Sequence, residues 1–150
     1  MLTVRVYGIL MQNSKEVLVS DEYIRGNFFT KFPGGGLELG EGTRDCLERE
    51  FMEEMNLSVK VGDHIYTTDF YQQSAFNQAH QILSIYYFAH PEEPLRVNFK
   101  NIPFDFLPNQ IADPKGTAEA FRLISLDDLS EEAVTLPIDK IVVGMIKRIL

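Results

Sequence analysis

Apolar and polar residues alternate with different periods along the chain, and each period predicts a different element. Leu47, Phe51 and Met55 recur every four residues with no proline between them, which predicts a helix over Thr43–Met55. A second, amphipathic helix is predicted over Pro137–Leu150, with proline in its first turn. Segments rich in β-branched and aromatic residues predict extended structure at Thr3–Met11, Val17–Ser20, Phe28–Phe32, Val59–Asp69 and Gln81–Ala89.

These elements predict an α/β fold in which helices lie on opposite faces of a mixed central sheet, an α/β/α sandwich. A length of 150 residues suits one domain with a hydrophobic core of its own. No charge run, low-complexity block or internal repeat marks a second domain. We therefore expect a single domain over residues 1–150.

Three glutamates of the predicted helix, Glu50, Glu53 and Glu54, are three or four positions apart and so project from one side of it. That side borders the apolar stripe, where unpaired carboxylates repel one another and lose water. A cation is therefore needed beside them. Arg49, four positions before Glu53, can orient that carboxylate, but we expect it to point away from Glu50 and Glu54.

The negative charge that Arg49 leaves uncompensated suits a hard divalent cation. Oxygen ligands favour Mg²⁺ or Mn²⁺, and Mg²⁺ is commonly held by one or two carboxylates, several waters and substrate phosphates. The glutamates thus indicate a substrate that carries phosphate. The alternative interpretation is an acidic helix face solvated by water. The position of the acids beside the core argues against that alternative.

The predicted helix lies within a longer pattern of fixed spacing, formed by Gly35, Glu41, Arg49, Glu50, Phe51, Glu53, Glu54 and Leu57. This pattern resembles the Nudix box of the Nudix (MutT-like) hydrolases. Asn56 stands where the family has glycine, and asparagine is the next most tolerant residue for the left-handed conformation that ends a helix. The segment 32–36 resembles the family's proline-glycine entry to the box, and 119–129 resembles its late strand and short helix.

The resemblance implies a hydrolase in which water attacks the diphosphate bridge of a nucleoside diphosphate derivative. It implies a Mg²⁺ or Mn²⁺ site with ligands at Gly35, Glu50, Glu53 and Glu54. It implies catalytic roles for Arg49, Glu50, Glu53 and Glu119, and a less constant contribution from Glu41. The general base is a box glutamate or an acid from a distant loop. Glu119 and Asp113 are the downstream candidates, although Asp113, next to Pro114, better fits an ordinary loop role.

Two further groups of residues are candidates for contact with substrate. The segment 69–78 contains amides that could read the edge of a base, and aromatic rings that could stack on its face: Phe70, Tyr71 and Phe76. Packing of these rings on the core is an equally good interpretation. Arg25 and Lys31 could meet phosphate, although single basic residues are commonly solvated surface. The long segment Pro91–Lys115 is a lid, a specificity insertion or a contact of a homodimer.

Composition narrows the partners and the compartment. The net charge of −8 argues against nucleic-acid polymers as partners, and it means that an anionic substrate needs cations to screen it. No apolar run approaches membrane-spanning length, and the N-terminus lacks the pattern of a secretion signal. The only cysteine, Cys46, excludes an internal disulfide and fits a small buried hydrophobe in a cytoplasmic protein.

The expected substrate is therefore a small-molecule nucleotide. A nucleoside triphosphate, cleaved by a pyrophosphatase reaction, is favoured because the segment after the box lacks a convincing proline or tyrosine signature of other subgroups. The alternatives are ADP-ribose or a nucleotide sugar, a dinucleoside polyphosphate, and a nucleotide-sensing module of the same fold that does not hydrolyse its ligand.

Overall fold

The first strand, β1 (Leu2–Gln12), belongs partly to each of the two units into which the chain divides. The computed structural model describes every residue from Met1 to Leu150. One unit joins Met1–Leu10 to Pro33–Arg96, and the other joins Met11–Phe32 to Val97–Leu150. Each unit is thus built from two separate segments of chain. The single domain expected from the sequence stays a prediction.

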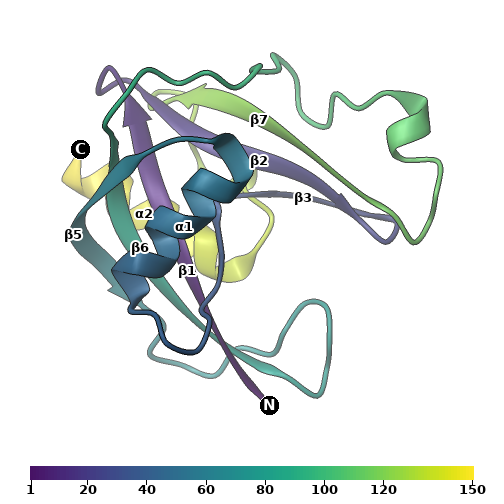
Figure 1. The fold of residues 1–150 in the computed structure, drawn as a ribbon, viewed down its shortest axis with the longest axis horizontal. Helices are drawn as coiled ribbons and strands as arrows, with labels where there is room; N and C mark the ends of the chain where they lie inside the picture. The colour runs from purple at the N-terminus through teal and green to yellow at the C-terminus, as the bar shows by residue number, and fades with distance from the viewer. The chain divides into compact units, whose positions relative to one another are not determined.

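The first unit is a mixed sheet with one helix (Figure 1). Its strands lie in the order β4-β1-β6-β5, because β1 pairs antiparallel with β4 and parallel with β6, and β5 pairs antiparallel with β6. The bounds of the remaining elements are β4 Gly34–Gly36, α1 Thr43–Met55, β5 Val59–Thr67 and β6 Gln81–Pro91.

Helix α1 packs closely on β1 because a glycine lies at the contact. A Cβ atom on Gly8 would lie 2.7 Å from Cε2 of Phe51 and 3.2 Å from Cδ2 of Leu47. Leu47, Phe51 and Met55 are all buried, so the apolar stripe that predicted the helix is the face that it buries. The helix ends at Asn56, whose φ of 50° and ψ of 42° are the left-handed conformation expected there.

The second unit is an antiparallel sheet with a C-terminal helix. Strand β2 is central: β7 pairs along one of its edges, and β3 and the last residues of β1 pair along the other. The elements are β2 Glu16–Ile24, β3 Asn27–Lys31, the 3-10 turn η1 Pro108–Gln110, β7 Thr117–Ser125, the 3-10 turn η2 Glu131–Ala133 and α2 Pro137–Ile149. No helix in the structure combines the length and the apolar character needed to cross a membrane.

Most of the predicted elements are confirmed, together with the α/β class and the mixed direction of the strands. Both helices lie where their periodicity predicts them. Strand β2 continues to Ile24, beyond the predicted end at Ser20, because its polar residues Asp21 and Glu22 are held by partners within the sheet. The short helix expected at the end of 119–129 is instead a turn, in which the N–H groups of Asp128 and Leu129 both donate to the carbonyl of Ser125.

A buried ion pair ties the second unit together. The carboxylate of Asp21, which is fully buried, accepts hydrogen bonds from Arg122 Nε at 2.5 Å and Nη2 at 2.9 Å. It also accepts one from Thr30 Oγ1 at 2.7 Å and one from the backbone N–H of Phe104 at 3.3 Å. One carboxylate therefore joins β2, β3, β7 and the long loop before β7. The same contact holds Phe104 in a left-handed conformation, with φ of 55°, which is unusual for a bulky residue.

Replacing Arg122 is expected to destabilise the protein strongly. Arg122→Met leaves the Asp21 carboxylate buried without its cation, so the free energy of unfolding in urea should fall by about 3–5 kcal/mol. The double variant Asp21→Asn/Arg122→Met should lose less, because no buried charge remains.

The matched control is Arg96→Met, which removes an exposed ion pair with Glu93 at 2.8 Å. It should cost less than about 1 kcal/mol. Equal losses from Arg122→Met and Arg96→Met would contradict the structural role of the buried pair.

Candidate functional site

The glycines of β4 allow the following helix to bring a carboxylate against the backbone. A Cβ atom on Gly34 would lie 2.0 Å from the carbonyl oxygen of Val6, so this residue must be glycine for β4 to pair with β1. A Cβ atom on Gly35 would lie 2.4 Å from both Cδ and Oε1 of Glu50. The carboxylate of Glu50 therefore rests directly on the backbone of Gly35, in space that any other side chain would fill.

Arg49 is the centre of a network of acids. Its Nε and Nη2 donate to the two carboxylate oxygens of Glu41, at 2.9 and 2.7 Å, and Nη2 also donates to the carbonyl of Gly36 at 3.1 Å. Its Nη1 donates to Glu50 at 3.0 Å and to Glu53 at 3.1 Å. All five N–H groups of the guanidinium thus have acceptors.

This network corrects one prediction. Arg49 was expected to orient Glu53 and to point away from Glu50, yet it contacts both carboxylates. The expectation rested on the direction of the Cα–Cβ bonds around the helix. The arginine side chain is long enough to turn back across that direction, and the planar fork of its guanidinium then reaches several acids together.

The ion pairs shift the protonation of the residues that make them. Hydrogen bonds from Arg49, and then from the backbone N–H of Glu38, lower the pKa of Glu41 from its ordinary 4.5 to about 2. The same bond with Glu41 raises the pKa of Arg49. Burial, followed by the nearby Glu41 carboxylate, raises the pKa of Cys46 to about 12. Cys46 therefore stays a buried thiol, and the thiolate that a nucleophile requires is disfavoured.

The predicted metal ligands lie on one side of α1 but do not point at one position. Glu50 is largely buried, Glu54 is partly buried and Glu53 is exposed. The carboxylates of Glu50 and Glu53 turn toward Arg49, and no three His, Cys, Asp or Glu side chains are close enough together to hold one metal ion. The chemistry of the donor set nevertheless fits Mg²⁺ or Mn²⁺, because the ligands are carboxylate oxygens on long side chains beside a glycine backbone.

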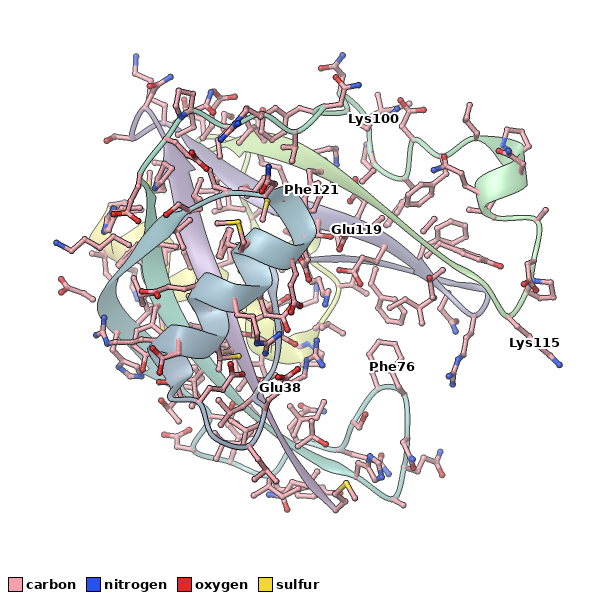
Figure 2. All side chains as sticks on the ribbon, viewed as in Figure 1. Glu38, Phe76, Lys100, Lys115, Glu119 and Phe121 are labelled. Carbon is pink, nitrogen blue, oxygen red and sulfur yellow. The ribbon has the colours of Figure 1, made fainter.

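The predicted stacking residues lie on the loop between β5 and β6. Phe70, Tyr71 and Phe76 are 42%, 66% and 51% exposed, so their rings are not part of the hydrophobic core. Figure 2 shows the Phe76 side chain projecting from this loop. Of the two interpretations drawn from the sequence, packing of these rings on the core is therefore the weaker.

The two basic candidates, Arg25 and Lys31, belong to the second unit and differ in their surroundings. Arg25 lies in the turn between β2 and β3, with φ of 49°, and is exposed. Lys31 is buried, and its Nζ lies 3.2 Å from a carboxylate oxygen of Glu22. Lys31 is therefore not the solvated surface residue that its type suggests.

Glu119, the downstream acid, lies in a polar cluster that sequence analysis missed. It projects from β7 directly opposite Glu22 of β2, and the hydroxyl of Ser20 lies 3.0 Å from Glu22 Oε2 and 3.1 Å from Glu119 Oε2. Although Glu119 as a residue is exposed, its carboxyl group is crowded by protein atoms. That loss of water, and then the Glu22 carboxylate, raises its pKa to about 7.

This cluster borders a cleft of about 430 Å³ lined by Glu22, Ile24, Thr117, Ala118 and Glu119. The two-residue spacing of Ser20 and Glu22 could have placed them on one face of a strand. The register that sets Glu22 opposite Glu119 is not readable from the sequence. Asp113, the other downstream acid, accepts a bond from the N–H of Lys115 at 2.9 Å, which is the loop role favoured for it.

The chain matches a known family and known structures. Residues 1–142 match the family model described as the NUDIX domain. A NUDIX hydrolase from Nitrosomonas europaea has 19% identity and a TM-score of 0.69, over 99% of this chain and 90% of that one. A MutT NUDIX hydrolase from Burkholderia pseudomallei has 15% identity and a TM-score of 0.68, over 97% and 98% of the two chains.

An ADP-ribose pyrophosphatase from Streptococcus suis is also similar, with 16% identity and a TM-score of 0.57 over 98% of this chain and 90% of that one. No curated protein sequence matches the chain. At these identities the similarity to solved structures shows a shared fold.

The raised pKa of Glu119 predicts a pH dependence of stability. Between pH 4.5 and 7 the unfolded chain has released this proton while the folded chain retains it, so this group makes the free energy of unfolding fall as the pH rises through that window. Carboxyl NMR titration should find the pKa of Glu119 well above 4.5. Glu22→Gln should lower that pKa, because it removes the facing charge.

Urea unfolding at a series of pH values gives the second readout. Glu119→Gln should remove this contribution to the pH dependence, whereas Glu48→Gln, an exposed acid on α1, should leave it unchanged. An ordinary titration of Glu119 near pH 4.5 would contradict the assignment.

Proposed function

The chain belongs to the NUDIX family of hydrolases, and on that premise we propose that it cleaves a diphosphate bond of a nucleoside triphosphate with the help of Mg²⁺ or Mn²⁺. The observation that carries the proposal is the seat of the Glu50 carboxylate on the Gly35 backbone, with Arg49 holding Glu41, Glu50 and Glu53 around it. This arrangement concentrates carboxylate oxygens beside a loop whose backbone is open to a ligand.

The proposed metal ligands are Gly35, Glu50, Glu53 and Glu54. A bound divalent cation supplies charge against the phosphate oxygens and lowers the pKa of a bound water. The carboxylate oxygens of the protein hold that charge in place. Arg49 keeps Glu50 and Glu53 ionised and near each other before a ligand arrives, because each shares its Nη1 group.

We propose that a carboxylate accepts the proton of the attacking water, and three residues compete for this role. Glu50 and Glu53 are hydrogen-bonded to Arg49, which favours their charged forms. Glu119 has a pKa of about 7, near the value at which a general base works best in neutral solution. The pKa supports Glu119 as the base, with Glu50 and Glu53 as metal ligands.

For substrate contacts we propose stacking of the base on the exposed rings of the β5–β6 loop, Phe70, Tyr71 and Phe76. Arg25 is the better of the two basic candidates for a phosphate, because Lys31 must first leave Glu22. The similarity to both a MutT hydrolase and an ADP-ribose pyrophosphatase keeps ADP-ribose, nucleotide sugars and dinucleoside polyphosphates as alternative substrates. We further propose a cytoplasmic, single-domain protein that can form a homodimer.

The experiment that tests this function measures hydrolysis of nucleoside triphosphates, nucleotide sugars, ADP-ribose and dinucleoside polyphosphates, with Mg²⁺ or with EDTA. Glu53→Gln and Glu54→Gln should each lower turnover at least about 100-fold, since metal activation contributes several kcal/mol to the barrier. Calorimetric titration with Mg²⁺ should show the same variants binding the ion more weakly.

The matched control is Glu48→Gln, which removes an exposed carboxylate from the same helix without touching the acid network. Turnover by this variant should stay close to that of the unchanged protein. Full activity in both Glu53→Gln and Glu54→Gln would overturn the metal assignment. Tight binding of a nucleotide without turnover would instead favour the sensing module.

Two neighbouring glycines give a sharper test of the geometry. Gly35→Ala places a methyl group where the Glu50 carboxylate lies, so turnover should fall at least about tenfold, equivalent to about 1.4 kcal/mol in the barrier. In Gly36→Ala the added Cβ would meet only Arg5 Nη1, at 3.9 Å, and turnover should change little.

Both variants add one methyl group to the same short strand, so a general loss of β4 would affect them alike. Thermal melting monitors that loss. Equal activity of Gly35→Ala and Gly36→Ala would show that the seat of Glu50 on Gly35 has no part in the reaction.

A further inference from the structure

A cleft of about 570 Å³ in the first unit is lined by Arg44, Lys60, Val61, Gly62, Asp63 and His90. Neither the acid network around Arg49 nor the proposed substrate contacts include any of these residues. Two cations and an imidazole line the cleft against one carboxylate, in a chain whose net charge is −8. Such a local reversal of charge needs an explanation of its own.

The strand geometry brings the basic groups to one face. Lys60 of β5 and His90 of β6 are paired directly opposite each other, so their side chains leave the same face of the sheet. Beyond them, Gly62 and Asp63 lie between paired residues of β5 where β6 has only one residue, so β5 bulges. A Cβ atom on Gly62 would lie 2.6 Å from Nε2 of His90. The glycine therefore makes room for the imidazole at the bulge.

Arg44, from the first turn of α1, is held rigidly above this bulge. Its Nη1 donates to the carbonyls of Val61 at 3.1 Å and Gly62 at 2.9 Å, and its guanidinium lies 4.7 Å from the centre of the Tyr87 ring. Those two bonds use only Nη1, so three further N–H donors remain on Nε and Nη2. A guanidinium fixed in this way presents its fork without further loss of side-chain entropy.

We propose that this cleft binds a small phosphate dianion, either free phosphate or the phosphate group of a monoester. A tetrahedral dianion offers enough oxygens to accept from Arg44, Lys60 and His90 together, whereas a carboxylate offers two. A volume of about 570 Å³ lies within the range of small-molecule sites. This inference does not depend on the proposed hydrolytic function.

Titration of the full-length protein with inorganic phosphate in the presence of EDTA tests the proposal by amide NMR. EDTA removes divalent ions, so phosphate cannot bind through a metal at the acid network. We expect saturable shifts at Lys60–Asp63 and His90, with a Kd on the order of 1 mM. A parallel titration with adenosine monophosphate separates the sources: equal affinity assigns recognition to the phosphate alone, and tighter binding assigns it to a nucleotide.

Arg44→Gln/Lys60→Gln should weaken phosphate binding at least tenfold. The matched control, Lys100→Gln/Lys115→Gln, removes two exposed positive charges from the second unit and should bind phosphate within about twofold of the unchanged protein. Thermal melting and the amide spectrum check that each variant is folded. The proposal is overturned by shifts that do not saturate, by shifts confined to the Gly35–Leu57 segment, or by equal weakening in both double variants.

Discussion

The candidate site depends on one guanidinium group. Without Arg49, the acids on neighbouring turns of α1 and the acid of the preceding loop would repel one another where water is scarce. Its five N–H groups instead join Glu41, Glu50 and Glu53 to the carbonyl of Gly36. The loop and the helix are thereby held to each other at the place where Glu50 lies against Gly35. The acids thus remain charged and close together in the absence of any ligand.

The parts of the structure that local periodicity determines could be predicted from the sequence. The apolar stripe of α1 gave its ends, and the tolerance of asparagine for left-handed geometry gave its cap at Asn56. Strand β2 was predicted too short because alternation treats Asp21 and Glu22 as surface residues. Their partners, Arg122 and Lys31, come from strands whose register depends on the whole sheet. The reach of Arg49 to Glu50 was missed for a related reason, since a long side chain need not follow its Cβ direction.

Two adjacent residues of β2 show how a strand separates structural from chemical roles. Asp21 faces Thr30 and Arg122 and is fully satisfied within the sheet, which makes it a structural charge. Glu22, on the opposite face, crowds Glu119 and raises its pKa, which leaves a proton available near neutral pH. The period of two along a strand is what allows both roles side by side. Sequence alone distinguishes them poorly, because both are acids within one polar pair.

The division of the chain within β1 has a consequence for how the protein is made. Strand β1 pairs with β6, and β2 pairs with β7, so each sheet closes only when distant segments meet. During synthesis, β2 must wait until the ribosome has released residues as far as Ser125 before its pairing with β7 can finish. Until then the apolar residues of β2, such as Leu18, lack this neighbour. Contacts of such long range slow folding, so the nascent chain has a prolonged period in which chaperones can bind it.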